Sequence, residues 1–251
     1  MTEVALAVVL VVGATLLTRS FAALYERGPG FQPERALLLI PWMSPDYVVL
    51  HTNSRDLSSD EFWDDWTEQL VYFRTEFCRR VSALPGVGSA TMGTHQPMDT
   101  RVSLQPFTMR DVDGSNGVPE ALQVTVDRNY FEVLSIPLLR GRRFGPQDCK
   151  DTRPVVIVSQ DVARHSWPGE DAVGKQLKRG LPESDSPWAI VVGVVGDIRQ
   201  SGLDEAPTPS LYWPGAEVGS GPRMIVRTPG DPMALVPAIR KTFYEMTRRA
   251  D

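Results

Sequence analysis

The N-terminal apolar run constrains this chain more than any other feature. Residues 4–17 are apolar except at Gly13 and Thr15, and the apolar character resumes after Arg19 and continues to position 25. A membrane-crossing helix needs about 20 apolar residues, and an arginine near its end can extend its charged group to the interface. The run therefore predicts a transmembrane helix over 1–27, with Arg19 near one surface of the bilayer.

Two alternatives to a transmembrane helix stay open for this run. A secretory signal peptide would carry positive charge before the apolar run and a cleavage site of small residues after it. Here the only charge before the run is Glu3, and no Ala-x-Ala-like site ends it. A helix buried in a protein core is the second alternative, because core helices can be equally apolar.

The composition indicates a globular domain after the apolar run. Of 251 residues, 42% are hydrophobic and 23% charged, which is ordinary for a folded protein of this size. The formal net charge is -5, and no long run of lysine and arginine is present. We therefore expect no nucleic-acid partner, because such proteins usually present a basic face.

The clearest helix of the soluble part spans 62–84. Its apolar residues recur at steps of three and four and give one stripe: Phe62, Trp63, Trp66, Leu70, Phe73, Phe77, Val81 and Leu84. Pro85 and Gly86 end the helix. We expect the stripe to pack on a sheet, with Trp66 and Phe73 largely buried.

Short apolar or alternating stretches predict strands around this helix. They cover 36–40, 47–51, 87–92, 103–110, 121–126, 155–158, 189–195 and 223–227. Leu122, Val124 and Val126 alternate with polar residues, which is typical of a half-buried strand. The stretch 189–195 is the most hydrophobic, so we expect it to be a central strand.

Asp127, Ser159 and Asp231 each precede a predicted helix, and their side chains are of the types that cap helix N-termini. The helix after Asp231 carries Ile239 and Phe243 on its apolar face. This helix cannot bury that face alone, so we expect it to return to the 62–84 helix and to bring the two ends of the soluble part together.

One stretch has the spacing of a phosphate-binding loop. Residues 169–175 contain two glycines and Lys175 in the G-x4-G-K pattern. The next residue is Gln176, which lacks the hydroxyl that would bind magnesium, and Glu170 and Asp171 would repel phosphate. A helix precedes the loop where a strand is required. We therefore interpret 169–175 as a turn and expect no nucleotide binding.

No other pattern indicates catalysis, so we predict that the chain is not an enzyme and has no catalytic, cofactor or metal residues. The three histidines, His51, His95 and His165, do not form a metal-binding spacing. The acidic cluster Asp60, Glu61, Asp64 and Asp65 lies at the start of the 62–84 helix, where carboxylates complement the helix dipole.

The two cysteines and one cluster of arginines each allow two interpretations. Cys78 and Cys149 could pair outside the cytoplasm, but a buried free thiol at Cys78 is an equal alternative. Arg140, Arg142 and Arg143 form the densest basic cluster, which we interpret as a solvated turn and not as an anion site.

Four stretches, taken in order, resemble one known family. They are NYFEVLSIPLLRGRRF at 129–144, the segment 155–175, IVVGVVGDIR at 190–199 and LYWP at 211–214, and LPGV at 84–87 fits the same pattern upstream. The ordered set resembles the MacB-like periplasmic core domain of ABC-transporter permeases, the group that also carries an FtsX-like membrane domain. The resemblance covers essentially the whole chain.

The resemblance implies an α+β fold in two parts on the extracytoplasmic side of the bacterial inner membrane, after the transmembrane helix at 1–27. A porter-like part would comprise 34–126 and 215–251, with a small α/β subdomain inserted at 127–214. Such domains transmit ATPase-driven motion, so the implied partners are an ABC ATPase subunit, a second permease half or a homodimer partner, a periplasmic adaptor, and membrane lipid.

The chain departs from the family by ending at Asp251 without a second apolar segment. We therefore expect it to be a fragment of a longer permease, with a truncated product that does not transport by itself as the alternative. The alternative function is a membrane-anchored extracytoplasmic module that binds or senses a ligand without any transport role. No residue identifies a transported substrate.

Overall fold

The periodicity over 62–84 forms a helix, α3 (Asp60–Ser82), in a computed structural model of the chain. The structure describes residues 10–20, 22, 28–40, 60–99, 102–110, 117–148, 154–200, 202, 205–215 and 223–247. The side chains of 60–68 and 70 are not described, so the expected burial of Trp66 lies outside the described residues. The strand predicted at 47–51 lies outside them as well.

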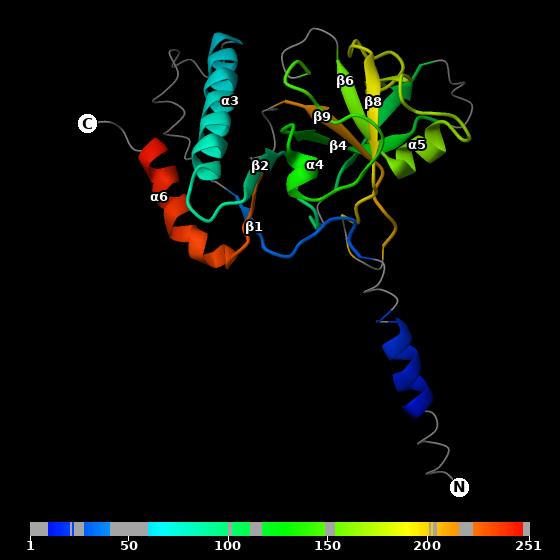
Figure 1. The fold of residues 1–251 in the computed structure, drawn as a ribbon. Helices are drawn as coiled ribbons and strands as arrows, with labels where there is room; N and C mark the ends of the chain where they lie inside the picture. The colour runs from blue at the N-terminus through cyan, green and yellow to red at the C-terminus, as the bar shows by residue number, and fades with distance from the viewer. Residues whose placement is uncertain are drawn as a thin grey trace.

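Three antiparallel strands form a small sheet beside α3. In spatial order they are β1 (Ala36–Leu39), β10 (Arg223–Arg227) and β2 (Ser89–Gly93), so the C-terminal strand lies between the two N-terminal ones. The helices α3 and α6 (Val236–Thr247) stand beside one another at this sheet (Figure 1). We call this unit the α/β body.

Its core confirms the expected packing of the aromatic stripe. Phe73 and Phe77 are each 1% exposed and lie in one cluster with side chains of β2, β10 and α6. The ring of Phe243 meets the rings of Phe73 and Phe77 edge-on at 5.8 and 5.6 Å between centroids, and Ile239 is buried in the same cluster. The C-terminal helix therefore returns to α3 as predicted.

Six strands form a closed ring beside the α/β body. Around the ring they are β4 (Glu120–Val126), β3 (Leu104–Met109), β7 (Gln176–Arg179), β8 (Ala189–Val195), β6 (Val155–Ser159) and β9 (Ser210–Pro214). Parallel pairing of β9 with β4 closes the ring. The strand β5 (Leu138–Gly141) pairs with β8. With the short helices α4 (Tyr130–Val133) and α5 (Gln160–Ser166), this unit is the barrel body.

Side chains from all six strands meet in one buried cluster, as a closed barrel requires. The strand β8 is central, as predicted, since it pairs with β5, β6 and β7. The strand β4 is not half-buried, because Ala121 lies in this cluster while Leu122, Val124 and Val126 lie in a second one that includes α4. The expectation of one solvated face on β4 was wrong because the barrel covers one face and α4 the other.

Two of the three predicted helix caps form. The hydroxyl of Ser159 accepts from the amide of Val162 at the start of α5, and the carboxylate of Asp231 accepts from the amide of Met233. The prediction for Asp127 was wrong. Its carboxylate accepts from the amide of Met92 on β2, and α4 begins without a side-chain cap.

Residues 10–20 form a helix that stands apart from both bodies (Figure 1). Within the described residues, no helix is both long enough and apolar enough to cross a membrane. The rest of the transmembrane helix predicted over 1–27, apart from 22, lies outside the described residues. The last turn of α6 lies on the side opposite helix 10–20 (Figure 1). The expected meeting of the two ends was therefore wrong, because the chain runs along the barrel body before it enters β1.

Candidate functional site: the linker and the joint between the two bodies

The segment 28–35, which we call the linker, leads from helix 10–20 into β1 and lies against the barrel body on its way (Figure 1). The amide of Arg199 donates to the carbonyl of Pro29 at 3.0 Å, and the amide of Gln32 donates to the carbonyl of Leu134 at 3.1 Å. The linker is therefore bonded to the barrel body by its main chain at two points.

Gly30 allows the linker to approach the barrel body this closely. It has a φ of +85°, and a Cβ at this position would lie 2.0 Å from the carbonyl oxygen of Asp197. Only glycine satisfies both the backbone angle and the contact. The neighbouring Phe31 packs against the buried cluster that contains α4.

Arg227, the last residue of β10, bonds the linker to both bodies. Its Nη2 donates to the carbonyl of Gln32 at 2.7 Å, and its Nε donates to the carbonyl of Val133 in α4 at 2.7 Å. Its Nη1 lies 3.4 Å from Oε1 of Gln32. Its main chain belongs to the sheet of the α/β body, where it pairs with Ala36 and Ser89.

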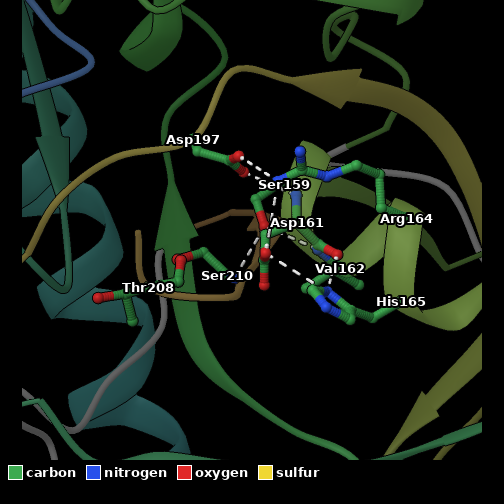
Figure 2. A network of polar contacts seen from close by, with 8 residues as sticks. All are labelled: Ser159, Asp161, Val162, Arg164, His165, Asp197, Thr208 and Ser210. Carbon is green, nitrogen blue, oxygen red and sulfur yellow. Dashed lines mark hydrogen bonds and ion pairs between the residues drawn. The ribbon is translucent and has the colours of Figure 1, made fainter. Parts of the chain in front are cut away.

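A polar network holds Asp197, the residue against which Gly30 lies (Figure 2). Oδ1 of Asp197 accepts from the amide of Asp161 at 2.7 Å, and Oδ2 lies 3.3 Å from Nη2 of Arg164. Burial raises the pKa of Asp197, while the bond from the Asp161 amide lowers it. His165 and Arg164 also face the Asp161 carboxylate at 3.3 and 3.5 Å. These outer ion pairs are exposed and contribute little stability singly.

Ser159 connects this network to the barrel. It is fully buried, and its hydroxyl oxygen accepts from the amide of Val162 in α5 at 3.4 Å and from the amide of Ser210 in β9 at 3.1 Å (Figure 2). One side chain thus satisfies a helix-terminal donor and a strand-terminal donor that would otherwise be buried without a partner.

The two bodies meet at a joint formed by 92–94 and 125–129. Only Gly93 and Val126 pair in register between β2 and β4. Hydrogen bonds of Thr94 with Thr125 continue the contact, at 2.9 Å between main chains and 3.0 Å to the Thr94 hydroxyl. The joint is therefore narrow in sheet pairing but well bonded.

Buried charge lies beside the joint. Arg74 of α3 is 3% exposed, and its charge lowers the pKa of Asp127, although burial of that carboxyl raises the pKa more.

Burial also raises the pKa of Cys78 to about 12. Cys78 carries a free thiol that is not activated as a nucleophile. Cys149 lies outside the described residues.

A shallow pocket of about 210 Å³ lies between β5, α5 and the turn that follows α5. Arg140, Arg164 and Glu170 are among the residues that line it. Arg140 lies 3.6 Å from a carboxylate oxygen of Asp171, and Arg164 is held by Asp197. These arginines already have carboxylate partners, so the pocket has no evident preference for an anionic ligand.

The stretch 169–175 forms the turn that the sequence predicts. It follows α5 and precedes β7, and Gly169 and Gly174 have positive φ angles. The ammonium of Lys175 forms an ion pair with Glu170, so it is directed at its own loop. A phosphate-binding loop needs a preceding strand and a lysine available to phosphate, and neither is present here.

The histidines and the acidic cluster, which the sequence analysis considered as possible site residues, are not brought together in one site among the described residues. His95 lies 3.3 Å from the Thr94 hydroxyl at the joint, and His165 belongs to the α5 network. His51 and the side chains of the acidic cluster at 60–65 lie outside the described residues. Over the part of the chain that the structure describes, no group of three His, Cys, Asp or Glu side chains could hold a metal ion.

The arginine cluster is solvated, but it is not simply a turn. Arg140 lies in β5, and Arg142 forms a two-pronged ion pair with Asp148 at 2.6 and 2.9 Å. This pair raises the pKa of Arg142 and lowers that of Asp148. Arg140 and Arg142 therefore form structural ion pairs, with Asp171 and Asp148 respectively.

Sequence reasoning missed the linker contacts and Arg227. Gly30 and Arg227 carry no local motif, and their partners are distant in the sequence. A glycine next to a proline is the only signal at the linker, and it is equally typical of the end of a helix. The joint residues were missed for the same reason, because their bonds depend on the tertiary arrangement.

The comparisons with known proteins agree with this architecture. A family model described as the MacB-like periplasmic core domain matches residues 4–236. The chain belongs to this family. It is therefore the extracytoplasmic domain of an ABC-transporter permease of the MacB and FtsX-like kind, and this family is a permease component and not a classical enzyme. No curated protein matches it significantly.

One solved structure, a MacB periplasmic region, shares this fold, and two other solved domains resemble part of the chain. The periplasmic region of MacB from Actinobacillus actinomycetemcomitans is 15% identical, with a TM-score of 0.53 over 87% of this chain and 86% of that chain. A domain of a putative permease protein from Porphyromonas gingivalis is 19% identical, with a TM-score of 0.48 over 67% and 74%. The extracellular domain of the noncanonic ABC-type transporter YknZ from Gram-positive bacteria is 14% identical, with a TM-score of 0.48 over 70% and 82%.

Proposed function

We propose that this domain transmits motion between a membrane-embedded segment and extracytoplasmic substrate or partners, within a permease driven by a separate ABC ATPase subunit. The observation that carries the proposal is the course of the linker. It bonds to the barrel body before its chain enters the α/β body as β1. A displacement of the linker therefore acts on both bodies.

Helix 10–20 supports a membrane anchor at 1–27. Five of its large apolar side chains are between 51% and 74% exposed in the isolated domain: Leu10, Val11, Val12, Leu16 and Leu17. An exposed apolar helix is costly in water and favourable in lipid. We infer an inner-membrane location, with lipid around this helix and both bodies on the extracytoplasmic side.

The resemblance implies two subdomains, and we propose that they correspond to the two bodies except at one boundary. The porter-like part would contain 34–126 and 215–251, and the inserted part 127–214. The strand pairings favour an earlier boundary, because β3 and β4 lie in the closed ring with β7 and β9. We therefore propose that the inserted part begins after β2.

We further propose that the domain works with a second permease half or a second copy of its own permease, and with a periplasmic adaptor. These partners would receive the motion that the two bodies transmit. The two bodies are joined by a narrow sheet contact and by a buried cluster that includes Ile225 of β10, so a change in their relative orientation would repack this cluster without unfolding either body.

Distance measurements on the complete permease with its ATPase in lipid nanodiscs would test the relay. We would attach spin labels at Tyr72 on α3, which is 65% exposed, and at His165 on α5, whose side chain is 78% exposed. The two cysteines, Cys78 and Cys149, would first be replaced by alanine. We expect the distance distribution between the labels to shift when ATP hydrolysis is trapped.

An ATPase variant that cannot bind ATP is the control, and the distance should stay constant in it. A distance that stays constant through the whole ATPase cycle would contradict the relay. A result of that kind, together with a chain that associates with no ATPase, would favour the alternative of an anchored binding or sensing module.

A further inference from the structure

The side chain of Arg227 is bonded in an unusual way for an arginine in a β-strand. It donates to two main-chain carbonyls, those of Gln32 and Val133, and to the side-chain carbonyl of Gln32. No ion pair joins it to an acidic residue within the described part of the chain. Its function is therefore not to neutralise a charge but to fix the positions of two chain segments.

The bonded segments belong to different parts of the molecule. Gln32 lies in the linker and Val133 in α4 of the barrel body, while the main chain of Arg227 is paired on both sides in the α/β body. The amide of Gln32 also donates to Leu134. The linker is thus held from both sides at one residue, by Arg227 on one side and by the end of α4 on the other.

The geometry requires an arginine. A guanidinium presents donors in a rigid planar fork, so it can bond two carbonyls in different directions at once. Hydrogen bonds from a charged donor are also stronger than neutral ones. A lysine ammonium places its three donors at one point on a flexible stem, so it cannot reproduce the separate Nε and Nη2 donors that hold the two carbonyls in fixed directions here.

We propose that Arg227 is the coupling residue through which displacement of the linker reaches the barrel body and the α/β body together. The inference rests on the proposed relay and names the contact on which the relay depends. Arg227 is a positioning residue and not a catalytic one. Without it the linker would keep its connection to β1 and its main-chain bonds to Leu134 and Arg199, but Gln32 would lose the bond that ties it, through Arg227, to β10 and to Val133.

The first test examines the resting protein. In Arg227→Gln we expect hydrogen exchange at the amide of Gln32 to become about tenfold faster or more, since the loss of charged hydrogen bonds opens this segment. Spin labels at exposed Glu34 and at His165 should give a broader distance distribution. Labels at Glu34 and Tyr72 should not, because β1 remains paired with β10.

Arg223→Gln is the matched control, because Arg223 lies at the other end of the same strand and is buried to a similar degree. It should leave exchange in the linker unchanged. Arg227→Lys keeps the charge and most of the side-chain packing, and it should reproduce the loosening seen in Arg227→Gln. If Arg227→Gln does not fold, Arg227→Lys replaces it in the same exchange measurement. A linker that stays as protected in Arg227→Lys as in the wild type would overturn the proposal.

The second test uses the complete permease with its ATPase. We expect the trapped-state shift between Tyr72 and His165 to be lost in Arg227→Lys and retained in Arg223→Gln. A full shift in Arg227→Lys would reject the coupling role while leaving the relay intact. An absent shift in the wild type would reject the relay, and the exchange measurement would still decide whether Arg227 clamps the linker.

Discussion

The side chain of Asp127 was correctly expected to accept a hydrogen bond from a main-chain amide, but the predicted donor was wrong. The sequence placed it before a short helix, and a helix does form there. The carboxylate instead bonds the amide of Met92 in the neighbouring strand, beside buried Arg74. A cap and an inter-strand bond use the same acceptor, so only the tertiary arrangement determines which donor it meets.

The titration of Asp127 should affect stability measurably. Burial raises its pKa above 3.8 in the folded state, so the folded protein retains this proton to a higher pH than the unfolded chain does. Stability from this group is therefore present below pH 3.8 and is lost as the pH rises through the folded-state pKa. Asp127→Asn removes this loss. The free energy of unfolding of the variant, measured relative to that of the wild type, should therefore increase as the pH is raised from acidic to neutral. Urea unfolding at several pH values checks this, and a difference that does not grow with pH would contradict it.

Phe73 is one of the buried residues of the aromatic stripe. It is 1% exposed and touches the rings of Phe77 and Phe243. We expect Phe73→Ala to lower the unfolding free energy by about 3–5 kcal/mol, because it leaves a cavity between two helices and a sheet. Tyr72→Ala, at an exposed position on the same helix, is the control. Chemical denaturation compares them, and equal costs for the two variants would refute this packing role.

At the scale of elements, the long and strongly patterned segments were predictable. The helix α3, the strands β6, β8 and β10 and the C-terminal helix all formed close to their predicted positions, because each carries its own apolar periodicity. The strands β5, β7 and β9 were not predicted as strands. They are four or five residues long, and β5 and β7 contain charged residues, so only their pairing partners define them.

Ser159 connects three elements of the barrel body. Its replacement should therefore lower the free energy of unfolding more than the loss of a simple helix cap does. Ser159→Ala leaves the amides of Val162 and Ser210 without their acceptor in a buried site. We expect a loss of about 2–4 kcal/mol, from the cap and from one unsatisfied donor. Asp231→Ala, which removes only an exposed cap, should cost about 1 kcal/mol. Thermal unfolding of both variants gives the comparison, and a cost for Ser159→Ala no larger than that for Asp231→Ala would be inconsistent with the double role.

At the scale of the whole molecule, the return of the C-terminal helix to α3 was predictable and the closed ring was not. The return of the C-terminal helix follows from unpaired apolar faces, which the sequence displays. The closure of the barrel depends on parallel pairing of β4 with β9, and neither strand shows in its own sequence which partner it will take. The linker contacts were equally inaccessible, because they join residues far apart in the sequence, through main-chain bonds and through the side chain of Arg227.

The two bodies should respond separately to local damage. In Phe73→Ala, we expect faster hydrogen exchange in the strands and helices of the α/β body, with amides of β6 and β8 unchanged. The reason is that the aromatic cluster contains no side chain of the barrel ring. Exchange measured by mass spectrometry locates the effect. Uniform acceleration across both bodies would show that they unfold as one unit.

The position of β10 between β1 and β2 also determines the order in which the chain can mature. Ala36 pairs with Arg227, so the α/β body cannot complete its sheet until nearly the whole domain has been synthesised and delivered across the membrane. All six strands of the ring, in contrast, lie between Leu104 and Pro214 and are available earlier. Contacts between distant residues form slowly. During biogenesis the barrel body should therefore fold first. Until β10 has been synthesised, the residues of β1 and α3 should remain exposed and prone to aggregation, so this segment should depend on protection by chaperones.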